Sequence, residues 1–370
     1  MPTVADLAKH LDRFAPPELA AEWDNVGLIV GDPSANVERV LTCLTVTTPV
    51  VAEAVGTRVQ LIVAHHPMLF RASKRLTTAT AEGRMLLELI RAGVAVYSPH
   101  TAFDNTTGGI NDVLARRLGL GDVTPLRTQP GPRQCKVVVF VPDKDLDRVA
   151  DAMFAAGAGN IGEYSQCSFR LAGTGTFFGS DAANPTIGEK GRREEVSEWR
   201  LEAICPEGLV EQVVRTMRRA HSYEEPAYDV YPLRPAACAV GAGRIGALPQ
   251  PVALTELAQR VKTVLNARLV QVVGEPARTV RRVAVACGAG GEFLGDAAAA
   301  GADVFLTGEM RFHDYLAAQA GNVGLLLPGH YASERCGIED LAERLQRDFP
   351  GLQVSASSRE CDPVALVLAS

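Results

Sequence analysis

The stretch LIVAHHPMLF, residues 61 to 70, decides the fold that we expect for this chain. Its first four residues are apolar and predict a short buried strand. His65 and His66 follow at the end of that strand, and Pro67 lacks the amide donor that continued strand pairing needs. Because the backbone turns at a strand end, both imidazoles can point into one pocket. Neutral imidazole is the commonest side-chain metal ligand near pH 7, although two histidines beside a turn can also simply be hydrogen-bonded.

Apolar strands and amphipathic helices alternate around this stretch, and the same alternation returns near the end of the chain. Alternation at short spacing predicts parallel sheets that are covered by helices on both faces. A long amphipathic helix with Ile338, Leu341 and Leu345 on one face completes the second run. The expected strands are residues 40–46, 59–66 and 94–98 in the first run and 283–289, 303–310 and 323–327 in the second.

The two runs match element for element, and each ends in a histidine followed four residues later by a carboxylate. The first run leads into a turn, PHTAFDN, with His100 and Asp104, and the second into a turn, PGHYASE, with His330 and Glu334. Open α/β sheets bind ligands beyond the carboxyl ends of their strands, where both pairs fall. Four residues apart on a helical turn places imidazole and carboxylate on one face. Two matches at equivalent positions indicate a duplicated site.

A segment of different character, residues 130–235, separates the two runs. It follows the Pro- and Gly-bearing stretch RTQPGPRQ, a plausible linker, and its expected order is β-α-β-β-α-β. We therefore predict an α/β protein in which two similar parallel-sheet halves form one domain, residues 1–129 and 236–370, interrupted by an inserted ferredoxin-like domain. Within the insert, HSYEEPAYDV, residues 221–230, is either a second polar site or an exposed turn between a helix and a strand.

The histidines and acids at the two strand ends have the chemistry of a metal site. Imidazole and carboxylate donors suit Zn, Mn, Fe or Ni as divalent ions, and the five candidates exceed what one four-coordinate ion needs. A pair of divalent metal ions sharing a carboxylate is the natural interpretation, and two such ions can polarise a substrate oxygen and activate water. His100, Glu309 and His313 are placed to orient ligands or move protons. The five candidate ligands are His65, His66, Asp104, His330 and Glu334.

Two turns are candidates for substrate binding. Asp24 and Asn25 precede a strand, where they either bond a ligand or form an ordinary turn. Gly288 and Gly290 lie in CGAGGEF, between a strand and a helix, where backbone amides either cradle an anion or close a tight turn. GAGRIG, residues 241–246, fits a dinucleotide fingerprint in letters only, because prolines soon after it leave no helix to meet a pyrophosphate.

The bulk composition excludes several classes of protein. A length of 370 residues suggests two or three domains, and 47% apolar with 22% charged residues is typical of globular proteins. A formal net charge of −6 gives no sign of a basic surface for nucleic acid, and no apolar run is long enough to span a membrane. The eight cysteines form no C-x-x-C pair, so we expect reduced core residues in a cytoplasmic protein without a signal peptide.

Five stretches of the chain resemble, in order, the GTP cyclohydrolase 1 type 2 homologue family of dinuclear-metal-centre hexameric proteins. They are WDNVGLIVGD, LIVAHHPMLF, SPHTAFDN, ADVFLTGEMRFHD and GHYASER. The resemblance covers nearly the whole chain, and the middle segment is similar to the PII/CutA-like insert of longer members. It implies that His66 and Asp104 serve one ion, His65 and His330 the other, and Glu334 bridges them. It also implies a ring-shaped homohexamer with the sites facing an internal cavity.

The resemblance leaves more than one function open. It implies a metal-dependent hydrolase that opens the guanine imidazole ring of GTP or acts on a related small molecule, with His100 or His313 as proton donor. The alternative is a metal-dependent binding or regulatory protein whose insert acts as a ligand sensor or cavity lid. A third possibility, a metallophosphoesterase, depends on the anion cradle at residues 288–291. Thr45 departs from the family pattern, because aspartate is expected there.

Overall fold

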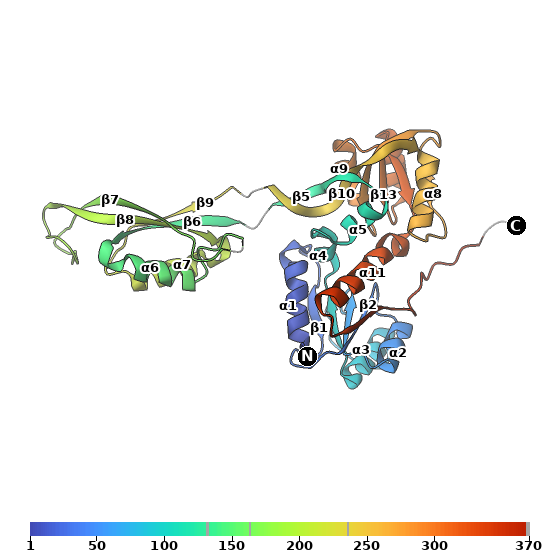
Figure 1. The fold of residues 1–370 in the computed structure, drawn as a ribbon, viewed down its shortest axis with the longest axis horizontal. Coiled ribbons are helices and arrows are strands. Elements are labelled where there is room, and N and C mark those ends of the chain that lie inside the picture. Colours follow the sequence, from blue (N-terminus) through green and yellow to red (C-terminus); the bar gives the residue numbers. More distant parts are fainter. Residues whose placement is uncertain (131–132, 163, 235–236, 368–370) are drawn as a thin grey trace. The chain divides into compact units, whose positions relative to one another are not determined.

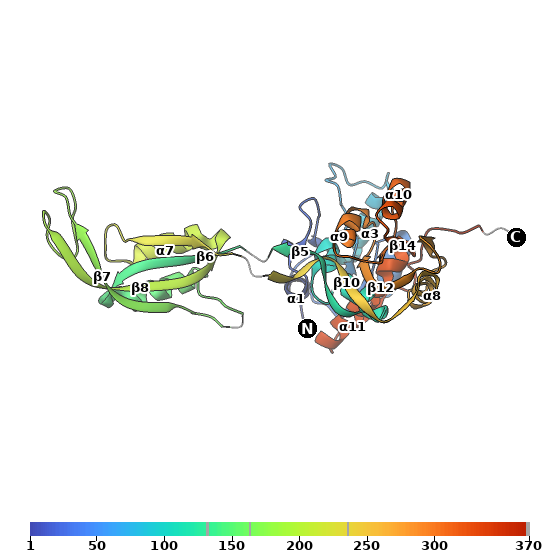
Figure 2. The ribbon, with the colours of Figure 1, turned by 90° about the horizontal axis from the view of Figure 1, so that it is seen from above.

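The computed structural model describes residues 1–130, 133–162, 164–234 and 237–367, and Figures 1 and 2 show two views of it. The chain divides into two compact units, one made of Met1–Gln129 with Ala239–Ser370 and the other of Pro130–Cys238. The expected boundary at residues 235 and 236 and the middle of the expected linker, residues 131 and 132, lie outside the described residues. The part of that linker up to Pro130 is the end of a strand.

The first sheet of the larger unit has the order β1-β4-β3-β2-β15. Its members are β1 (Gly27–Val30), β4 (Ala95–Ser98), β3 (Leu61–Ala64), β2 (Arg39–Cys43) and β15 (Gln353–Ala356). The last four run parallel, while β1 is an antiparallel edge. Helices α2 (Thr48–Gly56) and α3 (Ala81–Ala92) pack on one face, and α1 (Val4–Phe14) packs on the other. Every residue of β3 is therefore buried, as its unbroken apolar run predicts.

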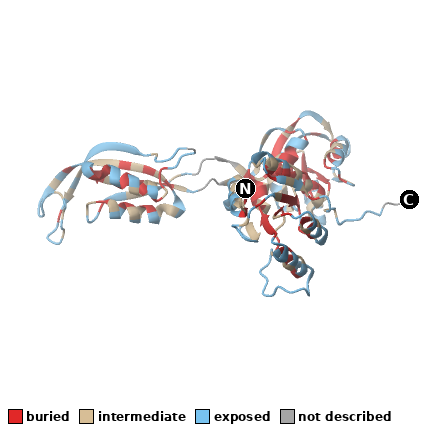
Figure 3. Ribbon diagram, turned by 60° about the horizontal axis from the view of Figure 1, so that its bottom comes forward, coloured by how far each residue is buried: buried red, intermediate tan, exposed pale blue. Residues whose placement is uncertain are grey.

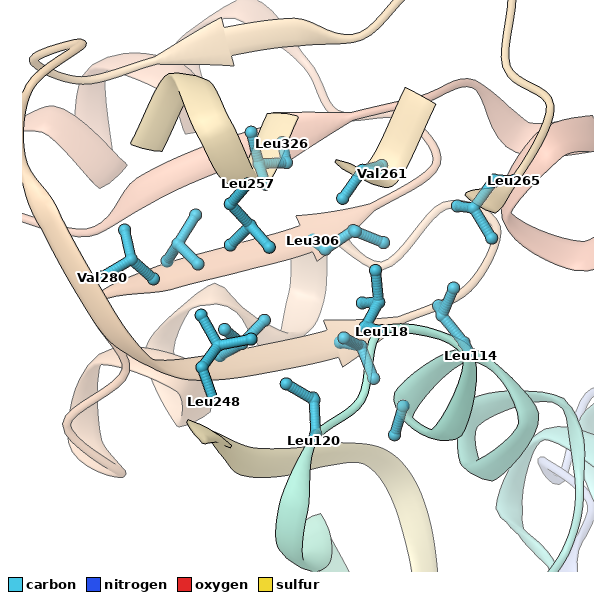
Figure 4. Close-up of a cluster of buried hydrophobic side chains, with 14 of the residues drawn as sticks. Leu114, Leu118, Leu120, Leu248, Leu257, Val261, Leu265, Val280, Leu306 and Leu326 are labelled. Atoms are coloured by element: carbon cyan, nitrogen blue, oxygen red, sulfur yellow. The ribbon is translucent and has the colours of Figure 1, made fainter. Parts of the chain in front are cut away.

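The second sheet has the order β11-β14-β13-β12-β10-β5. Its members are β11 (Gln271–Val273), β14 (Gly324–Leu327), β13 (Val304–Thr307), β12 (Thr279–Ala286), β10 (Ala237–Ala253) and β5 (Gly121–Pro130). The middle strands β14, β13 and β12 are parallel, whereas β11 and β10 pair antiparallel with their neighbours. Figure 4 shows the core between this sheet, helix α8 (Leu254–Val264) and helix α5 (Ile110–Arg117). The α/β prediction is confirmed in this coarser form, but both sheets are mixed rather than purely parallel.

The two halves of the larger unit exchange their last strands. After α5 the chain enters β5 of the second sheet, and after α11 (His330–Asp348) it enters β15 of the first. The two helices approach closely, because a Cβ on Gly337 of α11 would lie 2.5 Å from Cγ1 of Ile110 on α5. The Thr42 hydroxyl of the first sheet also donates to the Ile338 carbonyl of α11. This exchange holds the carboxyl ends of the two parallel strand sets beside each other.

Two expected turns at the site are helical. PHTAFDN forms the short helix α4 (His100–Asn105), and PGHYASE leads straight into α11, whose first residue is His330. The reason is that Pro99 and Pro328 lack the amide that would extend β4 and β14, so each strand ends there and a helix begins within two residues. The spacing of four between histidine and carboxylate therefore lies on helix, where it puts both groups on one face.

The smaller unit has the element order β6 (Gln134–Pro142), α6 (Leu146–Ala155), β7 (Phe169–Phe178), β8 (Arg193–Pro206), α7 (Val210–Ala220) and β9 (Tyr228–Pro232). Its sheet has the order β7-β8-β6-β9, and every pair in it is antiparallel. Both helices pack on one face of the sheet around a core of buried valine, leucine and methionine side chains. Figure 3 colours the buried residues of this unit red. Strand β7 ends at Phe178 and β8 begins at Arg193, so the loop between them spans residues 179–192.

GAGRIG is part of strand β10, which continues to Ala253, so no helix begins directly after the motif, as expected. Its Arg244 is only 2% exposed and forms an ion pair with Asp112 of α5. The same guanidinium donates to the backbone carbonyls of Gly241, Gly243 and Thr106. The motif therefore fixes the second sheet to α5 of the first half.

Each cysteine whose side chain the structure describes is a free thiol. Among the described helices, none combines the length and the apolar character that crossing a membrane requires.

Candidate metal centre

Three elements of the larger unit bring the predicted ligands together. His65 and His66 follow β3, and their amides still bond to the carbonyls of Cys43 and Leu44 beyond the end of β2. The other predicted ligands lie on the helices that begin where β4 and β14 end. His100 and Asp104 lie on α4, and His330 and Glu334 lie on the first turns of α11.

Glu334 is the central carboxylate of the cluster, and it is only 3% exposed. Its Oε2 lies 3.2 Å from Nε2 of His66, and its Oε1 lies 3.2 Å from Nε2 of His330 and 3.8 Å from Nε2 of His65. His65 Nε2 also lies 3.6 Å from Oδ1 of Asp104. By distance, His66 and His330 share Glu334, while His65 lies between Asp104 and Glu334, and the pairing of ligands that the family resemblance implies stays a prediction.

His65 is the candidate ligand whose surroundings fit a metal ion best. The side chain is 1% exposed, and neither ring nitrogen has a hydrogen-bond partner among the described residues. Burial lowers the pKa of His65 well below its usual value, so the ring is neutral and has a free lone pair. An unpaired polar group in the interior costs free energy, and a bound cation removes that cost.

The spacing of the donor atoms fits a divalent ion. Two ligands of a tetrahedral zinc ion with bonds of about 2.0–2.1 Å lie roughly 3.3 Å apart. The separations of 3.2 to 3.8 Å around Glu334 are close to that value. Among the described residues, two groups of three side chains could hold an ion, one formed by His65, His66 and His100 and the other by His66, His330 and Glu334. His100, which we expected to move protons, is therefore also a candidate ligand.

The charges of the cluster also favour a cation. Burial and the neighbouring Glu334 raise the pKa of Asp104 to about 7. Burial also works against ionisation of Glu334, but hydrogen bonding to His330 and His66 holds its pKa well below the usual value. Hydrogen bonding to Glu334, and then to Glu309, raises the pKa of His330 to about 9. Two acids that share one buried site need positive charge to ionise together, and a divalent cation supplies it.

Three imidazoles of the cluster are held at Nδ1 by an oxygen. Asp24 Oδ1 lies 2.7 Å from His100 Nδ1, and Glu309 Oε1 lies 3.0 Å from His330 Nδ1. The Thr45 hydroxyl lies 2.7 Å from Nδ1 of His66. A partner at Nδ1 fixes the tautomer and leaves Nε2 free for a metal ion. The threonine at the position where aspartate was expected thus orients His66 with a hydroxyl instead of a carboxylate.

The predicted substrate-binding residues are engaged within the protein. Asp24 accepts hydrogen bonds from the amide and hydroxyl of Thr101 as well as facing His100, which together hold its pKa at about 2 against the effect of burial. The Asn25 side chain donates to the Leu69 carbonyl. Both side chains therefore hold the loop in place, in agreement with the ordinary-turn alternative.

The glycine turn before α9 (Leu294–Ala299) is also internally bonded. The amide of Gly288 donates to the Ser333 hydroxyl, and the amide of Gly290 donates to the Thr307 hydroxyl. Both glycines are needed for space, because a Cβ at Gly288 would lie 2.3 Å from Glu334 Oε1. These contacts favour the tight-turn alternative over an anion cradle at these two amides.

His313 is the predicted site residue that the structure does not bring to the cluster. It is exposed on α10 (Phe312–Ala320), where its ring packs edge-on against Phe312. The reason is that α10 begins just beyond Arg311 and turns this residue toward solvent. Glu309, four residues earlier, still lies at the end of β13 and reaches His330.

Two residues at the site escaped the sequence analysis. Cys287 donates its thiol to Asp104 Oδ1 across 3.3 Å, and burial raises the pKa of this thiol well above its usual value. Trp23 is 62% exposed and packs edge-on against His100 with 6.1 Å between ring centroids. Two features of the sequence could have indicated them. Cys287 follows a buried strand, and Trp23 stands beside the Asp-Asn turn.

The cluster lies between two pockets. One has a volume of about 430 Å³ and is lined by Trp23, His100, Cys287, His330 and Glu334 among others. The other has a volume of about 500 Å³ and also includes His66 and His330 in its wall. Both volumes fall within the range of small-molecule sites. A ligand in the first pocket would contact both histidine-bearing half-sites.

The fold and this site define a class: an α/β protein built from two like halves, with a buried histidine–carboxylate cluster that could bind a metal ion. The chain belongs to the Duf34/NIF3 (NGG1p interacting factor 3) family, whose model matches residues 2–363. Relatives of this chain that carry the name "GTP cyclohydrolase 1 type 2 homolog" confirm the resemblance to that family.

The relatives cover nearly all of the chain. The "GTP cyclohydrolase 1 type 2 homolog" of Halalkalibacterium halodurans is 39% identical over 359 residues, 96% of each chain. The protein of the same name from Mycobacterium tuberculosis is 39% identical over 350 residues, which are 94% of this chain and 92% of that protein. Among solved structures, a Bacillus cereus protein related to NIF3 has a TM-score of 0.78 at 36% identity, and Staphylococcus aureus protein SA1388 has 0.83 at 27%, each with 99% of both chains covered.

Proposed function

We propose that this protein binds two divalent metal ions per chain and hydrolyses a nucleotide or a related small molecule. The observation that carries the proposal is the fully buried His65, whose unpartnered Nε2 faces two carboxylates from different helices. Relatives named "GTP cyclohydrolase 1 type 2 homolog" support a purine nucleotide as the first substrate to test.

The residues of the chain have separable roles in this proposal. The five predicted ligands, His65, His66, Asp104, His330 and Glu334, would hold the ions. When bound, such ions supply Lewis-acid polarisation and activate water near neutral pH.

His100 is the candidate proton carrier. Asp24 fixes its Nδ1 across 2.7 Å, so its Nε2 can hold or release a proton toward the pocket that it lines. Hydrogen bonding to Asp24 and the nearby acids raise the pKa of His100 despite burial, which suits a proton donor.

The pocket supports a planar aromatic substrate. Trp23 lines the pocket and Phe70 packs beside it against Trp23 and His100, and these two side chains are 62% and 48% exposed. A base could stack on these rings while its reacting atom reaches the cluster. Arg127, which lines the same pocket, is held by Glu292 and Asp296.

Turnover of millimolar GTP, followed by formate release, tests the hydrolase proposal. Activity should disappear with chelator and in Glu334→Gln, while the thermal unfolding midpoint shows that the variant still folds. His313→Gln serves as the matched control, because His313 lies on the surface away from the cluster. Inactivity of the metal-loaded protein on a broad panel of nucleotides and phosphoesters would contradict the proposal.

The alternative is a metal-dependent binding or regulatory protein without significant catalysis. The smaller unit favours it, because it has a core of its own and a cavity of about 550 Å³. We interpret this unit as an inserted ferredoxin-like domain, supported by its β-α-β-β-α-β order and antiparallel sheet. Calorimetric titration of the full chain with nucleotides separates the two functions, since this alternative requires binding without turnover.

The ring-shaped homohexamer remains a prediction of the family resemblance. Light scattering on the purified chain measures its mass directly, and a monomer or dimer at micromolar concentration would contradict it.

A further inference from the structure

The smaller unit contains a cavity of about 550 Å³ on the face of its sheet opposite α6 and α7. Its wall is formed by β6, β7 and β8, the loop between β7 and β8, and the turn between α7 and β9. Four aromatic side chains line it, namely Phe140, Phe177, Phe178 and Tyr223. A cavity of this size with aromatic walls is typical of small-molecule sites.

Glu198 of β8 is the carboxylate at the centre of this wall. It is partly buried, it forms no ion pair within the described residues, and its hydrogen-bonding neighbour is the Tyr223 hydroxyl. Gly175 on the neighbouring strand makes room for it, because a Cβ there would lie 2.1 Å from Glu198 Oε2. The glycine thus lets the carboxylate lie across β7 inside the cavity.

Tyr223 places a hydroxyl in the same wall, beside the Glu198 carboxylate. The hydroxyl oxygen is buried, and within the described part of the chain it accepts no hydrogen bond. Burial, followed by hydrogen bonding to Glu198, raises the pKa of Tyr223, so the hydroxyl stays protonated and can donate to that carboxylate. An oxygen that donates but accepts nothing leaves a place for an N–H donor from a ligand.

The neighbouring polar groups are already occupied. His221 Nε2 donates to the Phe140 carbonyl, and its Nδ1 accepts the Tyr223 amide. Glu225 forms an ion pair with Arg218, and Glu224 accepts the Asn184 amide. Only Glu198 and Tyr223 therefore remain to recognise a ligand among the charged and hydroxyl-bearing aromatic groups of this wall.

The charge of the wall specifies the ligand. The acidic side chains in it are Glu198, Glu224 and Glu225, and the described lining contains no lysine, arginine or histidine. Aromatic faces attract cations, and a carboxylate pairs best with amidinium or guanidinium nitrogen. We propose that this cavity binds a small organic cation whose N–H groups bond to Glu198 and Tyr223 while its apolar body packs on the phenylalanines. An anionic ligand such as a nucleotide phosphate would be repelled.

Benzamidine, benzamide and benzoate make a matched set of probes, because they share a shape and differ in charge. Each is titrated calorimetrically into the full chain after chelator treatment, so that benzoate cannot bind through a metal ion. Benzamidine should bind with a dissociation constant of roughly 1 mM or tighter, given its few atoms. Benzamide should bind at least about tenfold more weakly, and benzoate should not bind.

Two variants and a control locate the binding. Glu198→Gln should weaken benzamidine binding by about tenfold or more, and Tyr223→Phe by a smaller factor. Glu195→Gln removes the same charge from an exposed position of the same strand outside the cavity and should change nothing. If Glu198→Gln unfolds, Tyr223→Phe alone decides. The proposal would be overturned if benzamidine does not bind, if benzoate binds as tightly as benzamidine, or if the cavity variants keep the same affinity for benzamidine. None of these outcomes depends on whether the metal centre is confirmed.

Discussion

Replacing Thr45 by valine should weaken metal binding at His66. The Thr45 hydroxyl lies 2.7 Å from Nδ1 of His66, on the side of the ring away from Glu334. For Nε2 to bind an ion, Nδ1 must carry the proton and donate it to this hydroxyl. Valine keeps the shape of threonine and removes only the acceptor.

The size of the effect follows from what can replace the hydroxyl. Loss of such a partner typically lowers metal affinity by about 10–100-fold. Thr45 is exposed, so water can take the place of the hydroxyl, and the loss should be near tenfold, which is about 1.4 kcal/mol. Thr45→Asp should act in the opposite direction, because a carboxylate makes the imidazole a stronger ligand.

Competition for Zn²⁺ with a chromophoric chelator measures these affinities. Thr255→Val is the matched control, because the Thr255 hydroxyl bonds to the Pro276 carbonyl on the exposed surface. Thermal unfolding of the metal-free variants checks that they fold. An affinity of Thr45→Val within about twofold of the unmodified protein, or an equal loss in Thr255→Val, would refute the orienting role.

Three further perturbations test the fold and the limits of the site. Arg244→Ala should lower the free energy of unfolding by about 3–5 kcal/mol in urea denaturation, because it leaves Asp112 without its buried partner; a loss below about 1 kcal/mol would contradict that role. His313→Ala should leave the metal content unchanged and His330→Ala should reduce it, so equal losses by elemental analysis would place His313 at the site after all. The pKa of Asp24 is about 2 against a usual 3.8, so its ionised form stabilises the fold above about pH 4, and this stabilisation is lost as pH falls toward 2. Asp24→Asn should therefore cost about 2 kcal/mol at pH 6 and progressively less toward pH 2, and a cost independent of pH would exclude this linkage.

The sequence predicted that the candidate metal ligands lie together, but it did not predict which imidazole faces which acid. Two buried strands that end in polar residues, and the repeated spacing of histidine and carboxylate, were enough to bring His65 and Glu334 to one place. Which imidazole faces which acid depends on ring rotation and helix orientation, and sequence spacing does not specify these. Thr45 stood out as a departure, but its contact with His66 depends on the side on which the strand end turns.

The exchange of β5 and β15 between the halves could not be predicted from periodicity. A strand pattern shows that a segment pairs, but it does not say with which sheet. The repeat itself extends further than expected, because GLIVGDP at residue 27 and VQVVGEP at residue 270 form the equivalent edge strands β1 and β11. Their similarity was a usable signal for the antiparallel edges.

The metal content of the full chain, purified without an affinity tag and measured by elemental analysis, tests the central claim most directly. We predict about two divalent ions per chain, falling to one or fewer in Glu334→Gln, because this carboxylate faces His65, His66 and His330. A well-folded protein that holds no ion at micromolar free zinc, or that binds equally well without the Glu334 carboxylate, would contradict it.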